Sequence, residues 1–216
     1  MKSQRIIRHQ DLICMDEHTS ECNYRIDLAY ARDDNLLFGE RIYKEDAKLW
    51  LYKDLAKIVF IAARQCFEKY GMRFVLYDGL RTIDAQSAMM QTKRVIENPH
   101  WLEEPRMLSP AGAGGHPRGM AIDIGLEDSN GKLLDMGSAF DCFSEQSHRE
   151  YPHPTKIMDN RSILNESMIY AAKYLNIALV LLPQEWWDFR LPRDIYEQYA
   201  PLSDSELPQH MRLVDI

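Results

Sequence analysis

Apolar residues recur along the chain with a helical period in three stretches. Residues 45–70 place leucine, isoleucine, valine and alanine on one face, with acidic residues at the start and Gly71 after the end. This is typical of a helix. Residues 82–97 predict a second helix, with Thr82 as its N-cap. Residues from about 160 to 175 predict a third.

Shorter apolar runs predict strands. The run at 73–79 is rich in strand-forming residues, and the run at 120–126 alternates between aliphatic and small or acidic side chains. The turn sequence DSNG at 128–131 favours a hairpin. Residues 177–182 predict a buried strand that ends at Pro183. Because strands and helices do not alternate as βαβ units, we predict an α+β fold with a mainly antiparallel central sheet packed by helices.

Length and composition indicate one ordinary globular domain. The chain has 216 residues, of which 45% are apolar and 27% charged. We predict a single domain over residues 1–216. Residues 1–29 would form a peripheral N-terminal arm, and residues 192–216 a peripheral C-terminal tail.

Charge and cysteine content narrow the class of protein. The net charge is −7 and no run of lysine or arginine is present, so we expect no nucleic-acid partner. No window reaches the roughly 18 apolar residues that span a bilayer. The N-terminus shows no signal peptide, so we expect a cytoplasmic protein without a membrane partner. The four cysteines match no metal motif, and we expect reduced thiols; a Cys14–Cys22 bridge has little support.

The first candidate site lies in the sequence GGHPRGMAIDIGL. His116 is in a turn rich in glycine, and Asp123 lies on the strand face opposite the aliphatic residues. Imidazole nitrogen and carboxylate oxygen both suit Zn²⁺, and a histidine in a loop could share one ion with Asp123. The alternative is a turn histidine and an edge aspartate with no ligand.

The second candidate site is the sequence EWWDF at 185–189. Glu185 could act as a base toward water, and Asp188 could be a further metal ligand. In a regular strand, positions i and i+3 point to opposite faces, so a bulge, a bend or a strand end must intervene. The alternative is a core strand with acids at its edges.

The third candidate is Arg81, in YDGLRT. An arginine just past a strand end could stabilise an oxyanion or clamp a substrate carboxylate. The alternative is a surface salt bridge.

Together these motifs resemble a known family. The run around His116 and Asp123 resembles the SxHxxGxAxD signature of zinc D,D-peptidases related to Hedgehog-type domains. DGLR, MGSAFD and EWWDF are similar to motifs of the VanX-type D-alanyl-D-alanine dipeptidases. Order and spacing agree from about Tyr30 to Leu191. The resemblance implies a Hedgehog-like fold and a zinc dipeptidase that acts in cell-wall metabolism.

The resemblance also implies roles for individual residues. His116 and Asp123 match the first two zinc ligands, Glu185 the general base, and Arg81 the arginine that stabilises the transition state. In such enzymes, water activated by zinc attacks the carbonyl that joins two D-alanines, and the glutamate passes its proton to the leaving amine.

Two further positions match residues that bind the substrate. Asp141 matches the acid that receives the substrate's ammonium group, and Tyr30 matches a tyrosine that lines the small pocket. The resemblance therefore implies a small dipeptide as the partner, and leaves the oligomeric state open.

Two departures from the family pattern concern the site itself. Asp188 stands where the family has its third zinc histidine, and Gly114 and Gly115 replace serines. A His–Asp–Asp set carries two negative charges, which lowers the Lewis acidity of the metal and favours ions such as Mn²⁺ over zinc. His148 and His153 are nearby in sequence, but nothing places either on the metal.

Three hypotheses follow. The protein is a metallo-dipeptidase with one Zn²⁺ or another divalent ion per chain, or a member with weak or different peptidase activity. Alternatively, it is an inactive member that binds a ligand or partner. From the sequence, we expect Asp188→His to tighten zinc binding and to raise dipeptidase activity.

Overall fold

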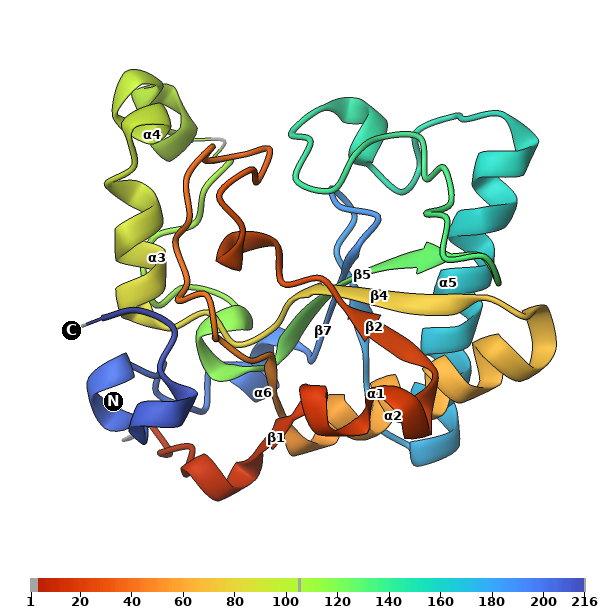
Figure 1. Ribbon diagram of the computed structural model, residues 1–216, viewed down its shortest axis with the longest axis horizontal. Coiled ribbons are helices and arrows are strands. Elements are labelled where there is room, and N and C mark those ends of the chain that lie inside the picture. The colour runs from red at the N-terminus through yellow and green to blue at the C-terminus, as the bar shows by residue number, and fades with distance from the viewer. Residues whose placement is uncertain (1–3, 105, 216) are drawn as a thin grey trace.

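A five-stranded sheet forms the centre of the molecule, with the strand order β2-β4-β5-β7-β6 (Figure 1). This computed structural model describes residues 4–104 and 106–215. Strands β2 and β4 are parallel, and the other neighbouring pairs are antiparallel. The strands are β2 (Tyr24–Ile26), β4 (Arg73–Asp78), β5 (Ala121–Glu127), β6 (Val180–Leu181) and β7 (Asp188–Arg190). The prediction of an α+β fold with a mainly antiparallel sheet is confirmed.

Two long helices pack against each other and against the central strands. They are α2 (Lys53–Tyr70) and α5 (Thr155–Leu175), and Figure 1 shows them on one side of the sheet. The shorter helices are α1 (Thr19–Cys22), α3 (Ile83–Met90), α4 (Lys93–Glu97) and α6 (Arg193–Tyr196). A second, two-stranded sheet pairs β1 (Leu12–Cys14) with β3 (Trp50–Tyr52).

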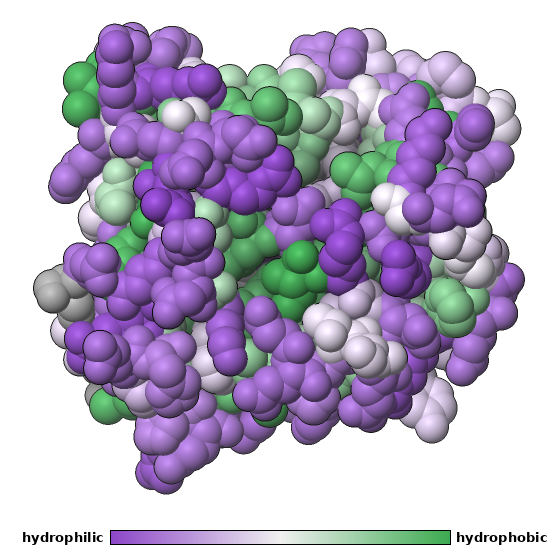
Figure 2. Space-filling view, in the orientation of Figure 1, coloured by the Kyte–Doolittle hydropathy of each residue, from purple (hydrophilic) through white to green (hydrophobic). Residues whose placement is uncertain are grey.

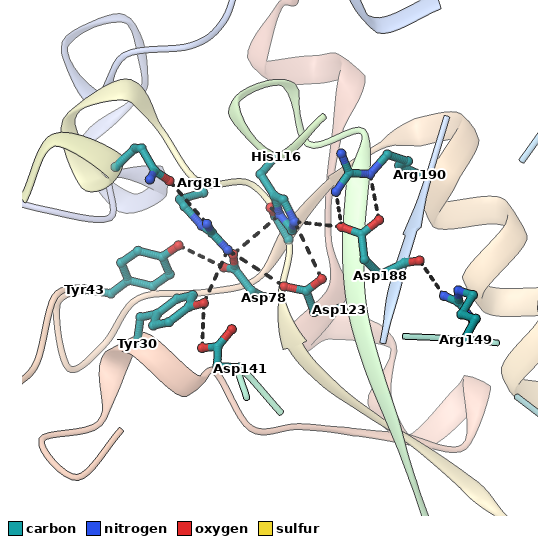
Figure 3. Close-up of polar contacts among 12 residues, drawn as sticks. Tyr30, Tyr43, Asp78, Arg81, His116, Asp123, Asp141, Arg149, Asp188 and Arg190 are labelled. Carbon is teal, nitrogen blue, oxygen red and sulfur yellow. Dashed lines mark hydrogen bonds and ion pairs between the residues drawn. The ribbon is translucent and has the colours of Figure 1, made fainter. Parts of the chain in front are cut away.

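The alternation along β5 separates the core from the site. Ile122 and Ile124 are fully buried with the aliphatic core. Because successive strand side chains point to opposite faces, Asp123 between them points to the other face of the sheet. That face is covered by loops rather than by α2 and α5, and the candidate site lies there (Figures 1 and 3).

The predicted helices exist, but their ends differ. The helix predicted over 45–70 begins only at Lys53, because Trp50–Tyr52 pairs with β1 instead of continuing the helical face. The helix predicted over 82–97 is divided at Thr92, whose hydroxyl donates to the carbonyl of Met89. Thr82 does cap its start, by accepting a hydrogen bond from the amide of Ala85.

The predicted strands at 73–79 and 120–126 are confirmed, whereas two other predictions are wrong in part. The expected buried strand at 177–182 is reduced to β6 (Val180–Leu181), an edge strand whose valine is 39% exposed. The hairpin expected at 128–131 amounts to one bridge between Glu127 and Leu133, because β5 pairs instead with β4 and β7. The four cysteines are free thiols, as predicted.

Both terminal segments take part in the packed structure. Tyr24, within the predicted N-terminal arm, is buried in edge strand β2. Asp204, within the predicted tail, is buried, accepts a hydrogen bond from the Thr82 hydroxyl and accepts another from the amide of Leu213. These segments therefore contribute to the sheet and core rather than lying only at the periphery. None of the helices in the described parts of the chain combines the length and hydrophobicity needed to cross a bilayer.

Candidate metal centre and catalytic pocket

Three aspartates form a row across three neighbouring strands. In the sheet register Asp78 of β4 lies opposite Asp123 of β5, which in turn lies opposite Asp188 of β7. All three are buried. A bulge between Leu76 and Asp78 brings the first of them into line. Like charges directly opposite one another destabilise a sheet, so this row requires cations beside it.

Two arginines neutralise the ends of the row (Figure 3). Nε and Nη2 of Arg81 contact Oδ2 of Asp78 at 2.8 and 2.6 Å. Arg190 donates from Nε to Oδ1 of Asp188 at 2.7 Å and from Nη2 to Oδ2. Asp123, in the middle, has no guanidinium of its own: Arg81 Nη2 is 3.8 Å away. Its Oδ1 is buried and has no hydrogen-bond partner among the described residues.

His116 lies over the middle of the row. Its Nδ1–H donates to the carbonyl of Gly79 at 2.8 Å, which leaves Nε2 facing Asp123 at 3.6 Å and Asp188 at 3.3 Å. Burial alone would lower the pKa of His116, but the adjacent carboxylates raise it to about 10. Nε2 therefore holds a proton when nothing else is bound, and a metal ion would take the place of that proton.

The donor set fits a divalent cation. Ligand atoms of Asp123, Glu185 and Asp188 lie within 4.8 Å of one another, as do those of Asp78, His116 and Asp123. Imidazole nitrogen and carboxylate oxygen are ordinary zinc ligands, and the unpartnered Oδ1 of Asp123 is the atom that such an ion would satisfy. His116, Asp123 and Asp188 are the residues that would hold it. Arg190 offsets the second negative charge of this set.

Glu185 reaches the same pocket from the turn before β7. The strand begins at Asp188, so the i and i+3 positions do not lie in one regular strand and both acids can face the site. Enclosure raises the pKa of Glu185 to about 8, and the charges of Asp188 and Asp123 add to this effect. A cation bound between the carboxylates would lower the pKa of Glu185 again and favour its ionised form.

Tyr30 and Asp141 form the other end of the pocket. The Tyr30 hydroxyl donates to Oδ2 of Asp141 at 2.8 Å and receives a longer contact from Arg81 at 3.4 Å. Burial raises the pKa of Asp141 to about 7, and the charge of Asp123 contributes. An ammonium group placed there would be a favourable partner for this carboxylate.

The pocket between these groups is small and has an apolar wall. Its volume is about 60 Å³, and Trp187 and Phe143 line it beside the charged residues. Phe143 and Glu185 also line an adjoining outer pocket of about 580 Å³. Trp186 lies behind the wall, where its indole N–H donates to the Ser138 hydroxyl at 2.9 Å. In Figure 2, apolar side chains are visible in the hollow at the centre of a largely hydrophilic face.

The structure brings every predicted site residue to one pocket, which is lined by Tyr30, Arg81, His116, Asp123, Asp141 and Glu185, with Asp188 directly beside it. Neither nearby histidine joins them: His148 lines the outer pocket, and His153 Nε2 contacts the carbonyl of Gln146 at 2.8 Å. Gly115 belongs to the packing of the loop, since a Cβ there would lie 2.9 Å from the carbonyl oxygen of Met120. The family serine therefore does not fit this backbone without movement.

Three charged residues of the site are not among those that the sequence pattern indicates. Asp78 stands near the end of the apolar run at 73–79, where nothing in the pattern distinguishes it from a residue that closes a strand. Arg190 could have been found, because it is two residues after Asp188 and so lies on the same strand face. Arg149 gave no local signal; it donates from Nη2 to the backbone carbonyl of Asp188 at 2.7 Å and from Nε to that of Leu182 at 2.9 Å.

Arg149 is expected to hold the segment around Asp188 in place. Replacing it with methionine keeps apolar contact with Phe189, whose ring centre lies 4.6 Å from the guanidinium carbon. The substitution removes three hydrogen bonds. The carbonyls of Leu182 and Asp188 then keep only their longer bonds from backbone amides, at 3.3 and 3.2 Å, and the Asn165 side chain loses its guanidinium donor. We expect Arg149→Met to lower the free energy of unfolding by about 2–4 kcal/mol. Urea denaturation measures this. Arg193→Met removes an arginine that is 79% exposed, and a loss as large as that of Arg149→Met would contradict a specific role.

Comparisons with known proteins identify the family of this chain. A family model described as D-ala-D-ala dipeptidase, of the M15 peptidases, matches residues 12–205. The chain belongs to the D-Ala-D-Ala dipeptidase family. A D-alanyl-D-alanine dipeptidase of Escherichia coli (strain K12) is 35% identical over 173 residues, which cover 78% of this chain and 79% of that protein. Membership in the D-Ala-D-Ala dipeptidase family supports a metal-dependent peptidase function, and the buried aspartate and histidine groups could bind the metal.

A solved structure shows a more distant likeness. It is the L-Ala D-Glu endopeptidase ChiX of Serratia marcescens, with 14% identity and a TM-score of 0.40 over 68% of this chain and 84% of that one. At this distance the likeness carries no inference about substrate for this D-Ala-D-Ala dipeptidase family member.

Proposed function

We propose that this protein hydrolyses D-alanyl-D-alanine, or a related D-amino-acid dipeptide, with the help of one divalent metal ion. The observation that carries the proposal is the unpartnered Oδ1 of Asp123, buried beside Nε2 of His116 with Glu185 facing the same space. Family membership and the small pocket support a short peptide with small side chains. Zinc is the proposed ion, and Mn²⁺ is the alternative that an oxygen-rich ligand set favours.

The ammonium group and the reacting carbonyl of the substrate would each meet a group of opposite charge. Asp141, assisted by the Tyr30 hydroxyl, would bind the ammonium group of the first residue. Arg81 is held by Asp78 and Gln86, so its positive charge is fixed beside the pocket. There it would stabilise negative charge that develops on the carbonyl oxygen.

Glu185 would move the proton. It would accept a proton from the attacking water as the new carbon–oxygen bond forms. It would then donate that proton to the leaving nitrogen as the peptide bond breaks, which releases two free amino acids. When bound, the divalent ion supplies Lewis-acid polarisation and makes water more acidic. The roles of the individual residues are part of the proposal.

The proposal is tested by metal removal and a chiral substrate pair. We expect protein stripped with a chelator to release alanine from D-Ala-D-Ala at least about 100-fold more slowly than protein reloaded with Zn²⁺ or Mn²⁺. L-Ala-L-Ala is the matched control, and its hydrolysis should be much slower. Metal content is measured on the same samples by mass spectrometry. No near-stoichiometric metal after reloading, or no alanine release with metal bound, would contradict the proposal.

A binding function without catalysis is the second candidate. It is favoured by one observation: both oxygens of Asp188 already accept hydrogen bonds from Arg190, so the third ligand has a partner without metal. This candidate predicts that the protein binds D-Ala-D-Ala in calorimetry but releases no alanine when saturated with either metal.

A further inference from the structure

Arg190 has one guanidinium nitrogen that the ion pair with Asp188 does not use. Nε and Nη2 donate to the two oxygens of Asp188, and Figure 3 shows the third nitrogen without a contact. Nη1 has no hydrogen-bond partner among the described residues. The side chain is nevertheless enclosed, with 17% of its surface exposed, and it lines the catalytic pocket with His116 and Glu185.

The sheet register explains why this nitrogen faces the pocket. Arg190 lies opposite Ala121 on β5, as Asp188 lies opposite Asp123. The alternation of β7 sends Phe189 into the core and both charged side chains to the site face. The methyl group of Ala121 leaves room for the guanidinium above it.

The loop that contains Gly114 leaves the space beside Nη1 of Arg190 open. Gly114 has a φ of +80°, a left-handed conformation that glycine adopts without strain. A Cβ built at Gly114 would meet Nη1 of Arg190 at 3.8 Å and no other atom within 4 Å. Gly114 therefore places no side chain between Nη1 and a ligand.

The other arginine of the pocket already has a partner at each of its three guanidinium nitrogens. Nε and Nη2 of Arg81 contact Asp78, and Nη1 donates to Gln86 at 3.2 Å. Arg190 is thus the pocket arginine whose outer nitrogen is available to an anionic ligand, within the part of the chain that the structure describes.

We propose that Nη1 of Arg190 forms a subsite for the free C-terminal carboxylate of the substrate. This inference rests on the proposed dipeptidase function, because a dipeptide carries both an ammonium group for Asp141 and a carboxylate for Arg190. The two subsites together select dipeptides with two free ends over peptides that are blocked or extended on the C-terminal side. The carboxylate of Asp188 fixes the guanidinium in place for this task.

The test compares a free acid with its neutral counterpart. The substrates are D-Ala-D-Ala and D-alanyl-D-alaninamide, which differ only at the C-terminal group. We expect wild type to prefer the acid by about 10–100-fold in kcat/KM, the range that one charge-assisted hydrogen bond supplies. Arg190→Met should reduce this preference to within about threefold, because methionine carries neither a charge nor a donor. Arg190→Lys should reduce it less, because its single ammonium keeps the charge but lacks the planar fork that spans both oxygens of Asp188 and still points a donor outward.

Controls separate the subsite from general damage. Arg149→Met disturbs the backbone of Asp188 from outside the pocket, so it should slow both substrates equally and keep the preference. Metal content is measured for every variant, since loss of metal also slows both substrates alike. Arg190 variants that keep the wild-type preference would overturn the proposal.

The same acid preference can be measured as binding affinity, which does not require the wild type to be active. In the metal-loaded Glu185→Gln protein, equilibrium dissociation constants for the acid and the amide are measured by calorimetry, with Arg190 intact and with Arg190→Met. Loss of the acid preference with Arg190→Met supports the subsite, and an unchanged preference overturns it. Absence of turnover by metal-loaded wild type, by contrast, counts against the proposed function alone.

Discussion

Glu185→Gln is expected to lower kcat for D-Ala-D-Ala by about 10²–10⁴-fold, the usual contribution of a general base. The substitution keeps the size and hydrogen-bonding shape of the side chain but removes its ability to take a proton. Metal content should not change, because His116, Asp123 and Asp188 would still provide the ligands. Alanine release is measured under metal saturation, with bound metal quantified in parallel.

A matched control lies in the adjoining outer pocket. Glu145 is exposed and lines that pocket with Glu185 but not the inner one, so Glu145→Gln should leave kcat within about threefold of wild type. If Glu185→Gln kept wild-type kcat, Glu185 would not be the base. If it lost the metal instead, Glu185 would be a ligand, which its proximity to Asp123 and Asp188 makes a meaningful alternative.

The local pattern was enough to predict the elements that carry the site. The alternating run at 120–126 is β5, and Asp123 does lie on the face opposite the aliphatic residues. Element ends were less predictable, because they depend on pairing between distant segments. Trp50–Tyr52 continues an apolar helical pattern in sequence, yet it pairs with Leu12–Cys14 as a strand.

The electrostatic balance of the site could not be predicted from the sequence. In the sequence EWWDF, Asp188 adds a negative charge relative to the histidine of the family pattern, and this suggests a weaker metal site. In the structure Arg190 contacts both oxygens of that carboxylate, so the charge change at one position is accompanied by a compensating charge two residues later. Asp78 and Arg81 repeat this arrangement at the other end of the row.

The row of aspartates and its neighbours would favour a bound cation. Five carboxyl groups meet at the pocket or its floor, whereas two guanidinium groups lie among them; the carboxyl groups are Asp78, Asp123, Asp141, Glu185 and Asp188. Buried charges of one sign are costly unless they are paired. A divalent ion and the ammonium group of a substrate would each supply positive charge to this cluster.

The pairing of Asp188 with Arg190 changes what Asp188→His should do. Imidazole is the ligand that the family pattern has at this position, and on that basis alone the substitution should tighten zinc binding. In this structure, however, it would leave the Arg190 guanidinium without its counterion beside a metal cation. Removing one partner of a buried ion pair costs about 3–5 kcal/mol, whereas replacing both is close to neutral.

We therefore expect Asp188→His alone to lower the free energy of unfolding by about 3 kcal/mol and to bind zinc no better than wild type. Asp188→His combined with Arg190→Met should recover most of that stability and bind zinc more tightly than wild type. Chemical denaturation of the apo-proteins and competition with a zinc chelator measure the two quantities. Activity is not the readout, since Arg190 is also the proposed carboxylate subsite. The single variants and the double variant form a thermodynamic cycle. If the effects of the two substitutions on the free energy of unfolding and on zinc affinity simply added, Arg190 would not be the residue that stabilises an aspartate at this position.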